Sequence, residues 1–146
     1  MSTEIIVSLL ITGHGMDPDA LSEQLGVQPT EAWRKGDALP HTTMQRKEDG
    51  WCLSVGPFES IDIPECARIL IEKVEPFRDR LKEILDAHRL DPPELSCVAY
   101  VEEENYPIVH FDKDLVEILA SLGAEIDVDV IHVGSNPAAN QEGSSG

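Results

Sequence analysis

Residues 16–37, MDPDALSEQLGVQPTEAWRKGD, are the most locally determined stretch of this chain. Asp17 is a good N-cap, and Pro18 suits the first position of a helix, where a backbone N–H is not needed. Gly26 can adopt the left-handed conformation that ends a helix, and Pro29 prevents the helix from resuming. The stretch therefore predicts a short capped helix, a turn, and then a loop that carries cationic and aromatic residues.

An apolar run, EIIVSLLIT at residues 4–12, precedes this stretch. Its side chains are apolar on both parities with only Ser8 between them, which is typical of a strand covered on both faces. The run is about half the roughly 20 residues that a membrane-spanning helix needs, and it lacks the basic flank and cleavage site of a signal peptide. We therefore predict a central strand of a sheet and no association with membranes.

Residues 33–55 predict a loop followed by a β-hairpin, with 41–47 as the outgoing strand and 51–55 as the return. Asp49 and Gly50 are assigned to the turn because a two-residue hairpin favours Asp-Gly. The outgoing strand is polar, so we expect it at an edge of the sheet. It could pair there with its copy in a homodimer, although its cations would oppose that pairing.

Capping residues and apolar spacing predict the remaining elements. Helices are expected from Asp62 to Val74, from Phe77 to His88 and after Asp112, and strands over 95–103, 108–111 and 125–133. The Met16-Asp-Pro-Asp and Leu25-Gly-Val segments are similar to Phe111-Asp-Lys-Asp and Leu122-Gly-Ala. A strand-helix-strand unit that has been duplicated would explain this similarity.

Together these elements predict a single α+β domain over residues 1–133. We expect a mostly antiparallel sheet of five or six strands packed by about four helices, in a ferredoxin-like arrangement. Residues 134–146 contain no large apolar side chain and are predicted to be a flexible C-terminal tail.

The chain is strongly acidic, with eleven Lys and Arg against twenty-eight Asp and Glu and a formal net charge of −17. From Leu90 onward there is one basic residue, Lys113, against twelve acidic ones. Such a field repels phosphate backbones and anionic lipids, so we expect neither nucleic acid nor a membrane as partner. A basic protein is the partner that this charge favours.

A small group of cations interrupts this acidity between residues 33 and 51. Guanidinium groups donate directed hydrogen bonds to carboxylates or phosphates, and indole rings offer flat surfaces for stacking. The alternative is that the second tryptophan fills the core and the cations only moderate an acidic surface. The candidate ligand-binding residues are Trp33, Arg34, Lys35, Asp37, Arg46 and Trp51.

Three cysteines, Cys52, Cys66 and Cys97, are odd in number and lack CxxC spacing, so neither a disulfide framework nor a zinc ribbon is expected. They fit a reducing cytoplasm, and Cys97 lies on an apolar parity typical of a core thiol. His110 and His132 flank the last helix and could approach each other. Without HxH or HExxH spacing, we predict no metal and no cofactor.

Asp127 and Asp129 lie two residues apart on the last predicted strand and project to the same side. Such a pair could act as paired carboxylates or bind a hard cation. The solvated face of an edge strand produces the same pattern without any function, and we favour that interpretation.

Four segments occur in the order LGVQPT (25–30), RKGD (34–37), DGWCLSV (49–55) and VHFDKDLVEILASLGAEIDVDVIHV (109–133). In this order they resemble a bacterial family called domain of unknown function 4279, over about residues 4–133. The residues that carry the resemblance are Leu25, Gly26, Pro29, Thr30, Gly36, Gly50, Trp51, Leu122, Gly123, Ala124, Ile126, Asp127 and Asp129. The family has no assigned activity or catalytic residues, so the resemblance implies a small α+β domain and no mechanism.

No catalytic motif stands out, so we predict a non-catalytic cytoplasmic binding or protein-interaction domain rather than an enzyme. The alternative is a small-anion or small-molecule binding protein, or an enzyme, that uses the region of Arg34, Arg46 and Trp51.

Overall fold

The computed structural model of the chain describes residues 3–88, 90–102 and 104–133, so the predicted tail at 134–146 lies outside the described residues. The protein is of α+β class, with helices packed on one five-stranded sheet. Its elements are β1 (Glu4–Gly13), α1 (Pro18–Leu25), β2 (Glu31–Trp33), β3 (Asp49–Glu59), α2 (Ile63–Val74), the 3₁₀ turn η1 (Glu75–Phe77), α3 (Arg78–His88), β4 (Glu94–Glu102), α4 (Lys113–Ser121) and β5 (Glu125–Val133).

Strand β1 lies at the centre of the sheet, whose strand order is β2-β3-β1-β4-β5. It pairs antiparallel with both β3 and β4, and β2 pairs antiparallel with β3. Strand β5 instead pairs parallel with β4. The predicted central strand is confirmed, and the sheet is mixed rather than purely antiparallel.

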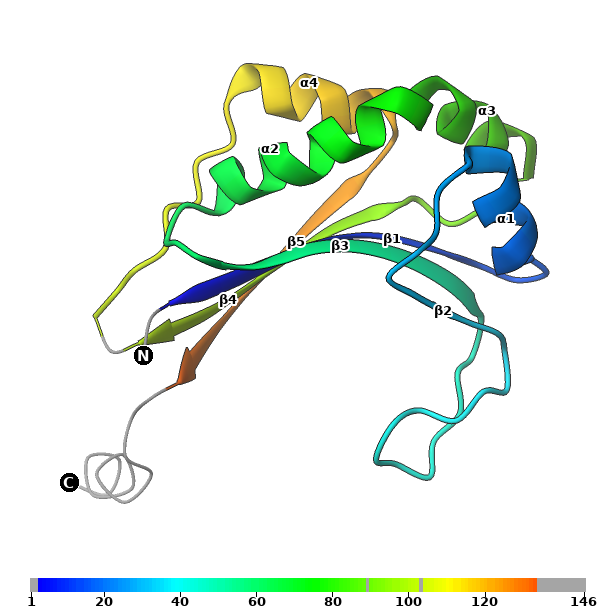
Figure 1. Cartoon of the computed structure of the whole chain (residues 1–146), viewed down its shortest axis with the longest axis horizontal. Coiled ribbons are helices and arrows are strands. Elements are labelled where there is room, and N and C mark those ends of the chain that lie inside the picture. The colour runs from blue at the N-terminus through cyan, green and yellow to red at the C-terminus, as the bar shows by residue number, and fades with distance from the viewer. Residues whose placement is uncertain (1–2, 89, 103, 134–146) are drawn as a thin grey trace.

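All the helices lie on one side of the sheet, whereas the β2–β3 loop extends past its other side (Figure 1). On the helix side, Ile5, Val7, Leu9 and Ile11 of β1 are at most 2% exposed and form the centre of the hydrophobic core. None of the helices in the described ranges is long and apolar enough to cross a membrane.

The prediction that β1 is covered on both faces is wrong. Ile6 and Leu10 point away from the helices and are only half-buried. They are shielded by their cross-strand neighbours Val98 and Cys52 rather than by a second layer of helices. An apolar side chain on a central strand can thus be partly buried by its neighbours on the adjacent strands, without a second layer of helices.

The hairpin turn predicted at Asp49 and Gly50 is also wrong. Both residues belong to β3 and pair with the end of β1. The connection between β2 and β3 is instead the loop 34–48, in which the predicted strand 41–47 forms only an isolated bridge from Gln45 to Ala38. A polar segment without an apolar face gains little by joining a sheet, which explains why it remains a loop.

Close packing, rather than a turn, explains the glycine at position 50. Gly50 pairs with Trp33 of β2, and the indole of Trp33 lies directly against it. A Cβ atom at position 50 would lie 2.0 Å from the Trp33 ring. Glycine within a strand often marks such a close approach.

The short strand predicted at residues 108–111 is absent from the sheet. Ile108 exchanges backbone hydrogen bonds with the segment that enters α2, from its N–H to Ile61 O at 2.7 Å and from Ile63 N–H to its carbonyl at 3.2 Å. It therefore forms a single parallel bridge with Asp62 instead of pairing with a strand.

The predicted helix boundaries are confirmed where they depended on capping. The side chains of Asp17, Asp62 and Asp112 each accept a backbone hydrogen bond at the start of α1, α2 and α4. Gly26 and Gly123 end their helices with φ angles of 72° and 67°. Local hydrogen bonds and left-handed glycines thus define these helix ends.

The variant Gly50→Ala should lower the free energy of unfolding by about 1–3 kcal/mol, because its methyl group collides with the Trp33 indole. Adding Trp33→Ala should remove the obstacle, so that the double variant loses less stability than the sum of the single variants. Urea denaturation of the three variants measures this coupling. Strict additivity would contradict the packing explanation.

Candidate functional site

Arg34, one of the predicted ligand-binding residues, is held by carboxylates of this chain. Its Nη2 lies 2.8 Å from Asp17 Oδ1 and 3.1 Å from Asp19 Oδ2. The hydrogen bond from Arg34 lowers the pKa of the Asp17 carboxyl, and the same contact raises the pKa of the guanidinium. Because Asp17 caps α1, this interaction joins the loop 34–48 to the N-terminus of that helix.

Arg46 packs on Trp33, and both residues help to order the same loop. The Arg46 Cζ lies 4.1 Å from the centroid of the Trp33 ring, and Arg46 Nη2 lies 3.2 Å from Glu31 Oε1. The backbone of Arg46 accepts a hydrogen bond from Gly36 and donates one to Asp37 O at 2.7 Å. A cation–π contact and an ion pair therefore hold the two ends of the loop together.

Trp51 is fully buried on β3, and its indole lies in the hydrophobic core. Its Nε1 donates a hydrogen bond to Ser22 Oγ at 2.9 Å, and Ser22 in turn donates to Pro18 O at 3.1 Å. These bonds satisfy the indole N–H and fasten α1 to the sheet. The ring is not exposed for stacking on a ligand.

Lys35 and Asp37, the remaining candidates, are exposed and take part in the turn at the start of the loop. Asp37 Oδ2 accepts a hydrogen bond from Arg34 N at 2.8 Å, and Lys35 N donates to Asp49 Oδ1 at 2.9 Å. The structure thus brings Trp33 and Arg46 together, sets Arg34 against α1 and places Trp51 in the core. These contacts give the candidate residues structural roles in the loop and the core. The role of the loop as a ligand site stays a prediction.

A second group of charged residues gathers on the side of the sheet opposite the helices of the described structure. In the parallel pairing of β4 with β5, Glu94 lies opposite Glu125, Ser96 opposite Asp127 and Val98 opposite Asp129. Paired residues project to the same side of a sheet, so the carboxylates of β5 all lie on the side of Glu94. We name this group, together with two acidic residues of adjoining loops, the acidic face: Glu48, Asp91, Glu94, Glu125, Asp127 and Asp129.

The acidic face includes an open hollow of about 380 Å³. Its charged lining consists of Glu48, Asp91, Glu94 and Glu125. Burial raises the pKa of Glu94, and the negative charges of Asp127, Glu125 and Asp129 raise it further. The pKa of Glu48 is raised by burial and then by its hydrogen bond and charge interaction with Asp91. The hollow therefore favours protons and positively charged groups.

Sequence reasoning identified only two members of the acidic face. Asp127 and Asp129 were recognised as a pair because they alternate along one strand, and the charge of Asp129 does raise the pKa of Asp127. The other four members were missed. Glu125 shares the parity of Asp127 along β5, whereas the sequence gives no sign that the segments holding Glu48, Asp91 and Glu94 meet. The excess of acidic residues after position 90 was the available signal.

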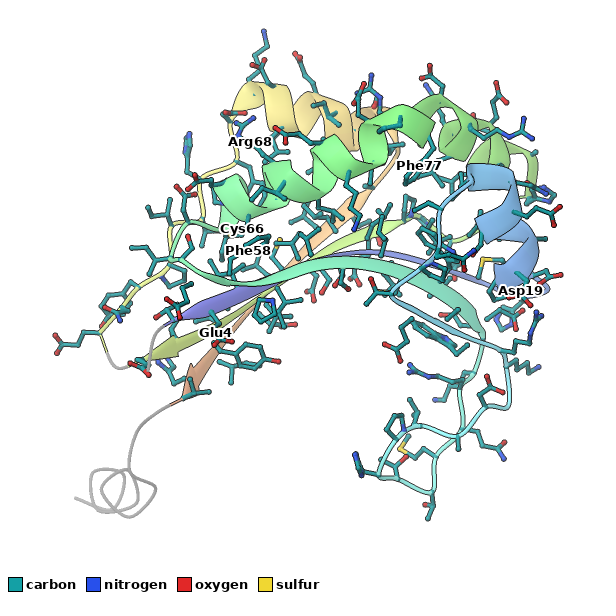
Figure 2. All side chains as sticks on the ribbon, in the orientation of Figure 1. Glu4, Asp19, Phe58, Cys66, Arg68 and Phe77 are labelled. Carbon is teal, nitrogen blue, oxygen red and sulfur yellow. The ribbon has the colours of Figure 1, made fainter. Side chains whose placement is uncertain are left out.

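Two other hollows occur on the helix side. One of about 210 Å³ includes His14 and His88, and one of about 320 Å³ lies between α2 and α4. Figure 2 shows Arg68 near the start of α4, where it forms an ion pair with Asp112. None of the six predicted ligand-binding residues lines any of the three hollows described.

The three cysteines are unpaired, and two of them, Cys66 and Cys97, are buried. Cys97 is completely buried, as predicted, and burial raises its pKa to about 12. Cys66 faces the sheet from α2 (Figure 2), and burial likewise raises its pKa. Over residues 3–88, 90–102 and 104–133, no group of three or more His, Cys, Asp or Glu side chains is arranged to hold a metal ion.

A mixed five-stranded sheet, with helices on one face and carboxylates on the other, defines a small α+β domain with an acidic surface. The chain belongs to the family described as Domain of unknown function (DUF4279), which matches residues 3–132. The resemblance seen in the sequence is thereby confirmed, and it brings no activity with it. Comparisons with curated proteins and with solved structures find no match.

Ser22→Ala should lower the free energy of unfolding by about 1–3 kcal/mol, because it leaves the buried Trp51 N–H without its acceptor. Helix propensity alone predicts the opposite sign, since alanine favours a helix more than serine does. Chemical denaturation distinguishes the two. A stability equal to or above that of the wild type would show that the indole hydrogen bond contributes nothing.

Asp129→Asn should raise the melting temperature at pH 7 in low salt. The folded protein holds protons on Glu94 and Asp127 more tightly than the unfolded chain, so it loses stability as the pH rises from the ordinary pKa values of these carboxyls through their raised values in the folded protein. Removing the charge of Asp129 should lower both pKa values and reduce that loss.

NMR titration and thermal melts measure these effects, and Asp86→Asn on the exposed surface of α3 is the control. The gain in melting temperature should shrink at high salt, because salt screens exposed charges. A fall in melting temperature at low salt would contradict the repulsion inferred for the acidic face.

Proposed function

We propose that this protein is a non-catalytic binding or protein-interaction domain that recognises a basic protein. The observation that carries this proposal is the acidic face, in which Glu94, Glu125, Asp127 and Asp129 lie side by side on the side of the sheet away from the helices. Burial and the charges of its neighbours raise the pKa of Glu94, and the charge of Asp129 raises the pKa of Asp127. A cationic partner relieves this repulsion on binding.

The charge of the whole chain supports the same kind of partner. A formal net charge of −17 produces a long-range field that attracts a basic protein and accelerates its encounter with the acidic face. The same field opposes binding to nucleic acids and to anionic membranes. Affinity would come from contacts formed after the encounter.

The alternative function, a small-anion or small-molecule site at Arg34, Arg46 and Trp51, has weaker support. Both arginines already form ion pairs with carboxylates of this chain, so an anion would have to compete with Asp17, Asp19 or Glu31. Trp51 would have to leave the core to contact it. An enzyme built on this region would need the same rearrangement.

We also propose that the domain has a ferredoxin-like arrangement. Strands β1 and β2 are parallel with β3 between them, and β3 and β4 are parallel with β1 between them. Helices α1 and α2–α3 connect these two pairs, which is the split strand-helix-strand connectivity of that fold. Helix α4 and β5 would then be an addition to it.

A duplicated unit and a cytoplasmic location remain parts of the proposal. Helices α1 and α4 share an Asp N-cap and a glycine stop, but residues 108–111 form no strand, so any repeat is confined to the capped helix and its end. The three cysteines are unpaired in the described structure, which suits a reducing compartment.

The proposal is tested with Asp127→Lys/Asp129→Lys and with Glu23→Lys/Asp86→Lys, which changes the charge equally on exposed positions of α1 and α3. The wild type and the control variant should capture basic proteins from a bacterial lysate at low salt, and the Asp127→Lys/Asp129→Lys variant should not. Equal capture by all three proteins would contradict the proposal.

A thermal-shift screen against phosphate, sulfate and small carboxylates tests the alternative function. Stabilisation that disappears in Arg34→Gln/Arg46→Gln would favour an anion site instead.

A further inference from the structure

Strand β5 forms an edge of the sheet that is long and regular. It is the last strand in the order β2-β3-β1-β4-β5, and its nine residues pair with β4 without a register shift. It contains no proline and no lysine, two of the usual devices that prevent a further strand from adding to an edge. The opposite edge, β2, has only three residues. The backbone of β5 is therefore the larger template for strand addition.

Apolar side chains remain exposed on the helix side of β5. Ile126 and Val130 are paired with the buried residues Leu95 and Ala99 of β4, so they point toward the helix side. Each is nevertheless 42% exposed, which shows that the helices do not reach fully across this edge. An added strand could cover both side chains with its own apolar residues.

The opposite side of the same strand is acidic over residues 125–129 and apolar at Ile131, which is 42% exposed. Glu125, Asp127 and Asp129 alternate with the apolar residues and are exposed. Over residues 125–130, a strand added to β5 would therefore meet carboxylates on one of its sides and apolar side chains on the other. Its best sequence would alternate Lys or Arg with Val, Ile or Leu.

We propose that β5 binds an extended segment of a basic protein by strand addition, with basic side chains over the acidic face and apolar side chains against Ile126 and Val130. This inference rests on the proposed function and specifies the mode of binding. The backbone hydrogen bonds of β5 contribute affinity, and the two sides of the strand contribute specificity.

A second copy of this chain fits the edge poorly when the two strands pair through the acidic part of β5. Antiparallel pairing about a two-fold axis at Val128 places Asp127 opposite Asp129 of the second copy, and the reverse pair forms as well. Like charges directly opposite each other destabilise a strand pair. A cationic strand has the complementary charge at these positions.

The probe is a nine-residue peptide in which lysine and valine alternate, and its binding to the full chain is measured by calorimetry. One comparison peptide has the same composition with its lysines grouped at one end. The other has the alternating sequence with alternate backbone nitrogens methylated, which removes the donors on one edge. Hydrogen exchange reports whether β5 becomes protected.

The alternating peptide should bind at least about tenfold more tightly than either comparison peptide, because only it combines the charge pattern with the backbone bonds. Binding should protect β5 amides. Asp127→Lys/Asp129→Lys should weaken it by about tenfold or more, whereas Glu23→Lys/Asp86→Lys should match the wild type within about twofold.

Equal binding of the alternating and grouped peptides would overturn strand addition and leave the basic partner standing. Absence of binding by all peptides at low salt would overturn both. If sedimentation shows a dimer that involves β5, the edge is occupied by a second copy. If the peptide binds only after the chain is truncated following Val133, the edge is occupied by the chain's own C-terminal residues. Either result would overturn the inference.

Discussion

The structure depends on β1 being hydrogen-bonded on both sides and buried on one face. Its antiparallel pairing with β3 and β4 makes those two strands parallel to each other, so the chain between them must cross the sheet. That crossing is made by α2 and α3 on the face where Ile5, Val7 and Leu9 are buried. No helix within the described residues covers the opposite face, which carries the acidic residues.

Charged side chains are paired with opposite charges at the β2 edge of the sheet, whereas carboxylates gather beside one another at the β5 edge. At the β2 end, Arg34 and Arg46 are paired with carboxylates and with the Trp33 ring, so that the cations order a long loop. At the β5 end, the described residues of β4 and β5 include several carboxylates and no Lys or Arg, and burial together with the neighbouring negative charges raises the pKa of Glu94. Because the arginines at the β2 end are already paired with carboxylates and the carboxylates at the β5 end have no Lys or Arg on their strands, the β5 side is the better candidate for binding.

Sequence reasoning succeeded where local interactions determine structure. Asp17 and Asp112 cap helices, and Gly26 ends one, because a hydrogen bond or a left-handed backbone within a few residues decides the outcome. It failed at Gly50, where an indole from another strand requires glycine within β3. It failed again at residues 108–111, which bind the entrance to α2 instead of a strand.

The sequence by itself determined the α+β class, the capped helices, the central apolar strand and the strongly acidic charge, because each follows from composition or from spacing along the chain. Only the tertiary structure decided that Trp51 lies in the core, that Arg34 and Arg46 are already paired, and that Glu48, Asp91 and Glu94 join Glu125 on one surface. The physical reason is that strand order and register bring distant residues together, and no local pattern records either.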